Sequence, residues 1–164
     1  MNAFVIDAFE FCRTNSKRDG VTPVAEMERL SKDCADDSGL IRWTAEGSTS
    51  KQGYPQMRLS VAGTVQLACQ RCLTPFAYEM NSSTLLMLGE SDADADEIEE
   101  LIDDESIDVI VGTRSMNLMD LIEDEALLAL PQSPRHEVCP DTALLDKLKS
   151  EKASPFAGLK DLKK

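Results

Sequence analysis

Four residues in this sequence have the types and the spacing of metal ligands. Cys69 and Cys72 form a C-x-x-C motif after a strongly alternating segment, and His136 and Cys139 lie far downstream with the same spacing. Structural zinc favours four nitrogen and sulfur ligands in a closed tetrahedron, and a C-x-x-C turn can place two thiolates on one ion. We therefore predict a zinc site formed by these four residues. The alternative is that both cysteines are reduced thiols in a tight turn and His136 is an ordinary surface histidine.

The sequence does not carry a recognisable catalytic arrangement. Its single histidine, His136, would have to be the base of any Ser-His-Asp site, and no serine lies in a nucleophile-elbow motif. A thioredoxin-like motif opens a helix after a strand, whereas strand-like alternation lies on both sides of this C-x-x-C. We therefore predict a protein that is not an enzyme, has no small-molecule substrate and has no cofactor apart from the possible zinc.

Alternating apolar and polar residues predict an antiparallel sheet. Residues 40–47 and 57–69 alternate, and the alternation resumes over 76–88 after the C-x-x-C motif and Pro75. This order places the motif at the tip of a hairpin. A further strand is expected over 107–111.

Two helices are predicted beside this sheet. One begins at Thr22-Pro23 and ends between residues 33 and 38, and the other runs from an Asn117 cap to Leu130. The predicted fold class is therefore α+β, an antiparallel sheet with a few packed helices.

One segment carries almost all of the net charge of −13. Residues 90–108 contain eleven acidic side chains and no basic one, while the parts before and after carry −1 each. Like charges repel one another, so we expect residues 90–106 to be disordered. The alternative is a docking surface for a basic partner, or a mimic of nucleic acid. The tail 147–164, with six lysines against two acids, is expected to be flexible.

The length of 164 residues suits a single domain, 1–164. The N-terminus lacks the features of a secretory signal, and no apolar run approaches the ~20 residues that cross a bilayer. We expect a cytoplasmic protein without a membrane partner. Its five cysteines are then better interpreted as thiols or ligands than as disulfides.

Two separated stretches resemble the bacterial YceD family. They are C-Q-R-C-L-T-P-F at 69–76 and L-I-E-D-E-A-L-L-A-L-P at 121–131, followed by His136 and Cys139. The order of elements from about Leu40 onward is also similar. The resemblance implies a role in the accumulation of large-subunit ribosomal RNA, as an assembly factor without catalytic activity. It also makes ribosomal protein L32 a candidate partner, because the two genes are neighbours in many bacteria.

Two functions are consistent with these observations. In the first, the protein is a non-enzymatic factor that supports large-subunit ribosomal RNA accumulation and ribosome assembly by binding an RNA precursor or a ribosomal protein. In the second, it is a zinc-stapled acidic module that escorts or inhibits a basic protein unrelated to the ribosome. Any direct RNA contact is expected to use Arg71 and the lysines of the tail, because phosphate binding depends on cations. The alternative for Arg71 is a surface pair with a nearby acid.

Overall fold

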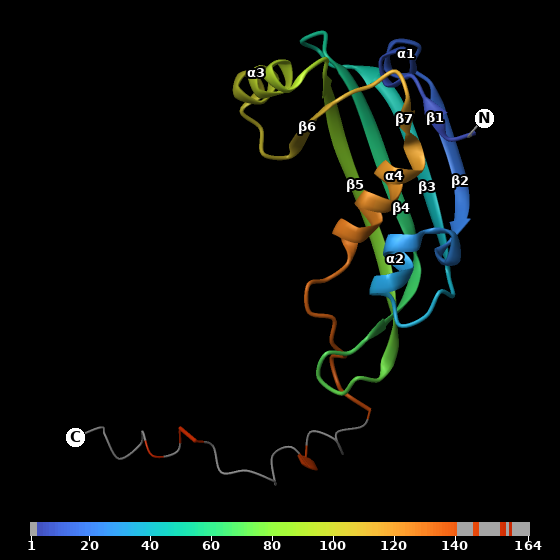
Figure 1. Ribbon diagram of the computed structural model, residues 1–164, viewed down its shortest axis with the longest axis vertical. Helices are drawn as coiled ribbons and strands as arrows, with labels where there is room; N and C mark the ends of the chain where they lie inside the picture. Colours follow the sequence, from blue (N-terminus) through green and yellow to red (C-terminus); the bar gives the residue numbers. More distant parts are fainter. Residues whose placement is uncertain (1–2, 141–145, 148–154, 157, 159–164) are drawn as a thin grey trace.

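The computed structural model describes residues 3–140, 146–147, 155–156 and 158. Most of this chain forms one twisted sheet with helices packed against it (Figure 1). The elements in chain order are β1 (Val5–Ile6), α1 (Ala8–Arg13), β2 (Lys17–Pro23), the 3-10 helix η1 (Val24–Glu26), α2 (Glu28–Asp33), β3 (Leu40–Thr49), β4 (Pro55–Ala68), β5 (Pro75–Gly89), α3 (Asp92–Ile102), β6 (Ile107–Val111), β7 (Met116–Asn117) and α4 (Leu118–Ala129).

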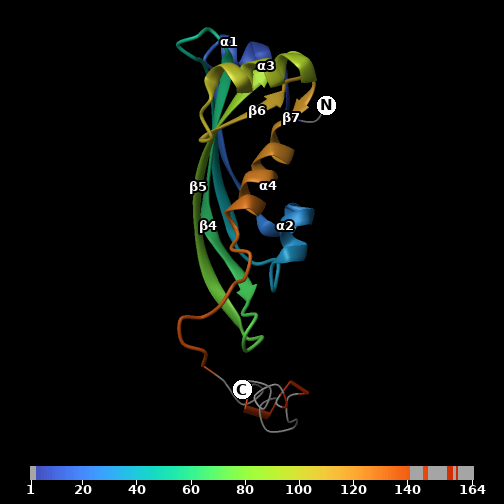
Figure 2. The ribbon, with the colours of Figure 1, turned by 90° about the vertical axis from the view of Figure 1, so that its left-hand side faces the viewer.

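The main sheet has the strand order β2-β3-β4-β5-β6. Its first four strands pair antiparallel with their neighbours along the chain, and β6 joins β5 in parallel after α3. β1 and β7 form a separate two-stranded sheet. α4 and α2 lie on the same face of the main sheet (Figure 2). The predicted α+β class and the strands expected in β3, β4, β5 and β6 are confirmed.

The core forms where the apolar side of the sheet meets α4. Along β4, Met57, Leu59 and Val61 are buried and alternate with more exposed neighbours, as the period of two requires. On α4, Leu118 and Ile122 are fully buried at helical spacing. Burying this face is therefore the main favourable contribution to folding.

The predicted α4 helix is confirmed, including its cap, whereas the N-terminal part differs from the expectation. Asn117 Oδ1 accepts a hydrogen bond from the Met119 N–H at 3.1 Å. Thr22 and Pro23 end β2 and do not begin a helix, and the helical residues that follow divide into η1 and α2. Thr22 is held in the strand because its hydroxyl accepts a hydrogen bond from Trp43 Nε1 at 3.0 Å. α1, capped by Asp7, was not predicted at all.

The acidic segment 90–106, expected to be disordered, instead contains the helix α3. Ser91 Oγ caps this helix by accepting from the Asp94 N–H at 3.2 Å, and acids in its first turn favour the positive end of the helix dipole. Ala95 and Ile98 are buried beside β5 and β6. The free energy gained by burying these two side chains exceeds the repulsion among the carboxylates, which is weak because they remain in water. Most of the tail 147–164, predicted to be flexible, lies outside the described residues.

A buried carboxylate joins α4 to α2. Glu123 Oε1 accepts hydrogen bonds from the backbone N–H groups of Arg29, at 2.6 Å, and Leu30, at 3.0 Å. These N–H groups belong to the first turn of α2, where Met27 at the N-cap offers no side-chain acceptor. Glu123 therefore caps a neighbouring helix, and the Arg29 guanidinium pairs with both Glu123 and the exposed Asp124. None of the helices in the described ranges is long and apolar enough to cross a membrane.

We expect Glu123→Ala to lower the free energy of unfolding by about 2–3 kcal/mol, because it removes a charged acceptor and leaves N–H groups of α2 without a partner. Asp124→Ala removes the exposed half of the Arg29 interaction and should cost about 1 kcal/mol or less. Urea unfolding of both variants beside the intact chain tests the difference. Equal losses would show that Glu123 acts only as a surface ion pair.

Candidate metal centre

The C-x-x-C motif lies in the connection between β4 and β5. The last pair of the two strands is Ala68 with Pro75, so residues 69–74 reverse the chain. Within this turn the Leu73 N–H donates to the Cys69 carbonyl oxygen at 2.8 Å, and the Cys69 N–H donates to the Thr74 carbonyl oxygen at 3.1 Å. Leu73 has φ +61°, a left-handed conformation that tightens the turn. Cys69 and Cys72 are both buried there.

The segment after α4 runs along the molecule to this turn (Figure 1). The Gln70 N–H donates to the Pro134 carbonyl oxygen at 2.8 Å, which fixes the two backbones side by side. The His136 N–H then donates to Cys69 Sγ at 3.5 Å, and the His136 ring lies 4.8 Å from the Phe76 ring between centroids. These contacts position His136 and Cys139 against the motif.

The structure brings the four predicted ligand residues into one cluster. Cys69 Sγ lies 3.9 Å from Cys139 Sγ, Cys72 Sγ lies 3.4 Å from His136 Nδ1, and all four ligand atoms lie within 4.8 Å of one another. Tetrahedral zinc with ordinary bond lengths separates two sulfur ligands by about 3.8 Å and a sulfur from a nitrogen by about 3.6 Å. The donor set and its spacing fit, so this cluster could bind a metal ion such as zinc.

Backbone hydrogen bonds prepare Cys69 to act as a thiolate. Burial by itself raises the pKa of this thiol, but the N–H groups of Cys72, His136 and Arg71 point at the sulfur and lower the pKa to about 5. Burial and the sulfur atoms of Cys72 and Cys69 raise the pKa of Cys139. Because thiolates are the metal-binding form, loading the cluster releases protons from the remaining thiols.

Two exposed arginines lie next to the cluster. Arg71 projects from the turn between the two cysteines, and its backbone N–H donates to Cys69 Sγ at 3.4 Å. Arg135 immediately precedes His136 and was not singled out from the sequence, although its position beside a predicted ligand could have indicated it. Within the described part of the chain, neither guanidinium forms an ion pair.

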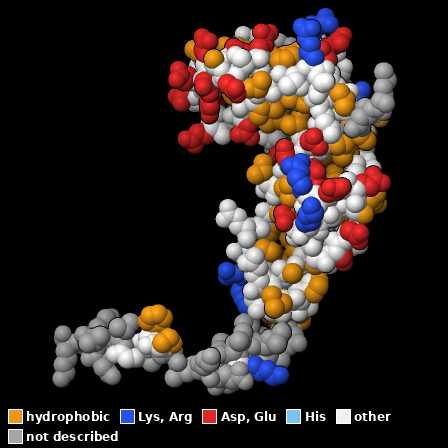
Figure 3. Space-filling view, in the orientation of Figure 1, with side chains coloured by type: hydrophobic (Ala, Val, Ile, Leu, Met, Phe, Trp, Pro, Cys, Tyr) orange, Lys and Arg blue, Asp and Glu red, His pale blue; other side chains and the backbone are white. Residues whose placement is uncertain are grey.

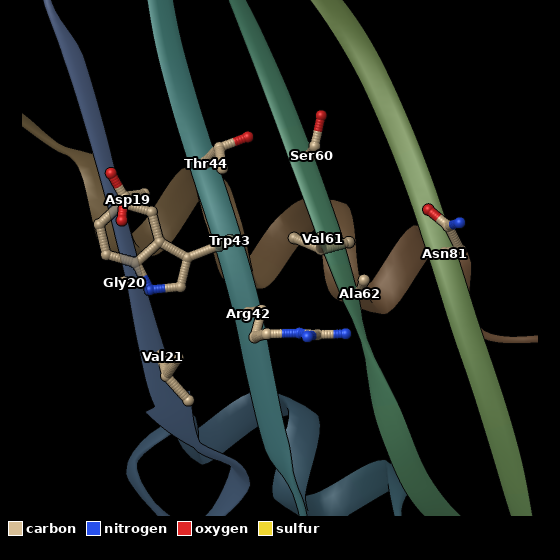
Figure 4. A pocket seen from close by; sticks show the side chains of 10 residues that line it. All are labelled: Asp19, Gly20, Val21, Arg42, Trp43, Thr44, Ser60, Val61, Ala62 and Asn81. Atoms are coloured by element: carbon tan, nitrogen blue, oxygen red, sulfur yellow. The ribbon is translucent and has the colours of Figure 1, made fainter.

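A hollow lies on the face of the main sheet away from α4, and its residues are less suited to binding or catalysis than the Cys₃His cluster. It has a volume of about 320 Å³, and Arg42 extends across it from β3 towards β4, near the small side chain of Ala62, with α4 behind the strands (Figure 4). The charged side chains in its lining are Asp19 and Arg42. These opposite charges do not form a cluster of titratable or ligating groups.

Fold and site together define an α+β domain whose hairpin turn and C-terminal segment meet in a Cys₃His cluster. A family model described as "Large ribosomal RNA subunit accumulation protein YceD" matches residues 57–163, and the chain belongs to this family. The matched range includes the turn, α4 and all four cluster residues. Membership implies a role in the accumulation of large-subunit ribosomal RNA. No solved structure matches the chain.

We expect the reduced chain to bind zinc and to unfold at a higher temperature with zinc than after treatment with EDTA. Binding to the folded cluster adds to the folding free energy, on the order of 10 kcal/mol in small zinc modules. Cys72→Ala should abolish the zinc-dependent shift. Cys34→Ala, which removes a thiol outside the cluster, should retain it.

Thermal unfolding followed by circular dichroism, with metal content measured on the same samples, decides this prediction. A chain that purifies without metal and melts at one temperature with and without zinc would contradict it. A zinc shift of equal size in both cysteine variants would place the metal elsewhere.

Proposed function

We propose that this protein is a non-enzymatic assembly factor that contacts precursor large-subunit ribosomal RNA through the turn beside the metal centre. The observation that carries the proposal is the pair of exposed arginines, Arg71 and Arg135, on two segments joined at that centre, and neither arginine forms an ion pair with a described residue. Family membership supports a role in ribosomal RNA accumulation, and the Cys₃His cluster would hold the two segments rigidly for the contact. Such a factor would act in the cytoplasm, where bacterial ribosomes assemble.

Two features favour phosphate as the ligand of these arginines. The backbone hydrogen bond from Gln70 to Pro134 keeps the residues that carry the two guanidinium groups close to each other. A guanidinium can hold a phosphate with two parallel hydrogen bonds, and a fixed backbone reduces the entropy lost on binding. The tail lysines, predicted from the sequence to assist, lie largely outside the described residues.

The distribution of charge also favours this end of the molecule for RNA. Acidic side chains gather over α3, at the end of the molecule away from the β4–β5 turn (Figures 1 and 3). Phosphate repulsion by those carboxylates is screened over about 8–10 Å at physiological salt. The acidic end favours a second, basic partner, and ribosomal protein L32 is the candidate that the family resemblance supplies.

We expect labelled precursor RNA to bind the intact chain at low salt and to bind Arg71→Ala and Arg135→Ala more weakly. Each lost phosphate contact should reduce the slope of log affinity against log salt by about 0.7 for single-stranded RNA. Arg114→Ala removes an exposed arginine away from the metal centre and serves as the matched control. Fluorescence anisotropy at several salt concentrations gives both quantities.

Ribosome profiles from cells that lack the protein, together with RNA titrations, separate this proposal from the alternative of a module that binds a basic protein unrelated to the ribosome. Loss of an assembly factor should lower the large-subunit peak in a sucrose gradient, and the double variant Arg71→Ala, Arg135→Ala should fail to restore it. Equal RNA affinity for all variants, or no binding at low salt, would rule out the arginine contact. An unchanged large-subunit peak would instead support a partner outside the ribosome.

A further inference from the structure

An apolar groove lies where α4, β6 and α3 come together, away from the metal centre. Its volume is about 400 Å³, and Leu86, Ile110 and Leu121 contribute apolar surface to it. Leu128 of α4 also lines it and is 78 % exposed, so it extends the apolar surface of the groove towards solvent. Figure 3 shows hydrophobic surface beside the acidic side chains of α3. This combination marks a candidate docking surface.

All of the charged side chains that line this groove are acidic. They are Glu99 of α3, Asp108 of β6, and Asp124 and Glu125 of α4. Asp124 already pairs with Arg29, and Asp108 accepts a weak hydrogen bond from Thr84 at 3.4 Å. The groove therefore presents apolar contact area inside a negative potential.

Glu125 distinguishes the groove from a merely acidic surface. It is only 6 % exposed, and Ser82 Oγ donates to its Oε1 at 2.6 Å. The second carboxylate oxygen has no hydrogen bond or ion pair within the described part of the chain. Every fully inaccessible side-chain oxygen there has a partner, so this oxygen keeps some exposed surface, and Glu125 lines the groove. Buried charged groups in proteins are usually paired, so a cation is the fitting partner for this carboxylate.

We propose that the groove binds an amphipathic basic segment of a partner protein, with an arginine or lysine directed at Glu125 and adjacent aliphatic side chains packed on Leu121 and Leu128. The charge decides against two other occupants. Nucleic acid would meet the four carboxylates with its own phosphates, and a second copy of this chain would bring a net charge of −13 to a negative site. The proposal does not depend on the RNA contact, because it uses different residues.

The test measures binding of a fluorescent synthetic helix with leucines on one face and arginines beside them. Two matched probes replace the arginines with neutral citrulline or the leucines with serine. We expect the first peptide to bind the full chain and both replacements to bind at least about tenfold more weakly, since the groove requires charge and apolar contact together.

Variants of the chain locate the contact. Glu125→Gln keeps the shape and removes the buried charge, and Leu128→Ser removes the exposed apolar side chain; each should weaken binding about tenfold. The matched controls are Glu97→Gln and Leu101→Ser, which make the same changes at exposed positions of α3 outside the groove and should leave affinity unchanged. RNA affinity should be the same for all four.

Several results would overturn the proposal. Equal weakening by Glu97→Gln and Glu125→Gln would mean that only the overall negative field attracts the peptide. Self-association of the chain that Leu128→Ser abolishes would make a second copy the occupant. Peptide binding that appears only after the tail lysines are changed to glutamine would assign the groove to the chain's own tail. Because Glu125→Gln also alters the bond to Ser82, Leu128→Ser tests the same surface without touching it.

Discussion

The pairing of β4 with β5 is the interaction on which the rest of this structure depends. The two strands stay in register from Gln56 opposite Met87 to Ala68 opposite Pro75. Side chains on a strand alternate between faces, so a slip of one residue would turn Met57 and its buried neighbours towards water. The same register places the C-x-x-C turn directly after the last pair, Ala68 with Pro75. The core and the candidate metal centre therefore depend on one alignment.

α4 contacts parts of the molecule that differ in charge. Its neighbouring acids serve separate purposes, because residues two apart on a helix point in nearly opposite directions. Glu123 faces α2 and caps it, whereas Glu125 faces the sheet and reaches the groove beside β6. Past its C-terminus, Pro134 meets the hairpin turn. One helix thus connects the acidic end, where α3 lies, to the cationic end at the cluster.

Much of the fold could be predicted because its signals are local. The alternation of β4 and β5 follows from neighbouring residues, and the Asn117 cap belongs to the turn that it stabilises. α1, α3 and the break between η1 and α2 could not be predicted in the same way. Asp7 and Ser91 cap α1 and α3 locally, but the helices also depend on burial against distant residues, as Ala95 and Ile98 show for α3, where composition alone indicated disorder.

The sequence by itself determined the types of the four ligand residues and the spacing within each pair, Cys69 with Cys72 and His136 with Cys139. A turn that brings two such ligands together involves only four consecutive residues. Only the tertiary structure decided that the pairs meet, since Cys72 and His136 are brought together by the path of α4 and the Gln70–Pro134 bond. The tertiary structure also decided that Arg135 lies beside the β4–β5 turn that carries Arg71, and that Glu125 is buried. Such proximity arises from packing between segments distant in the chain, which no local spacing specifies.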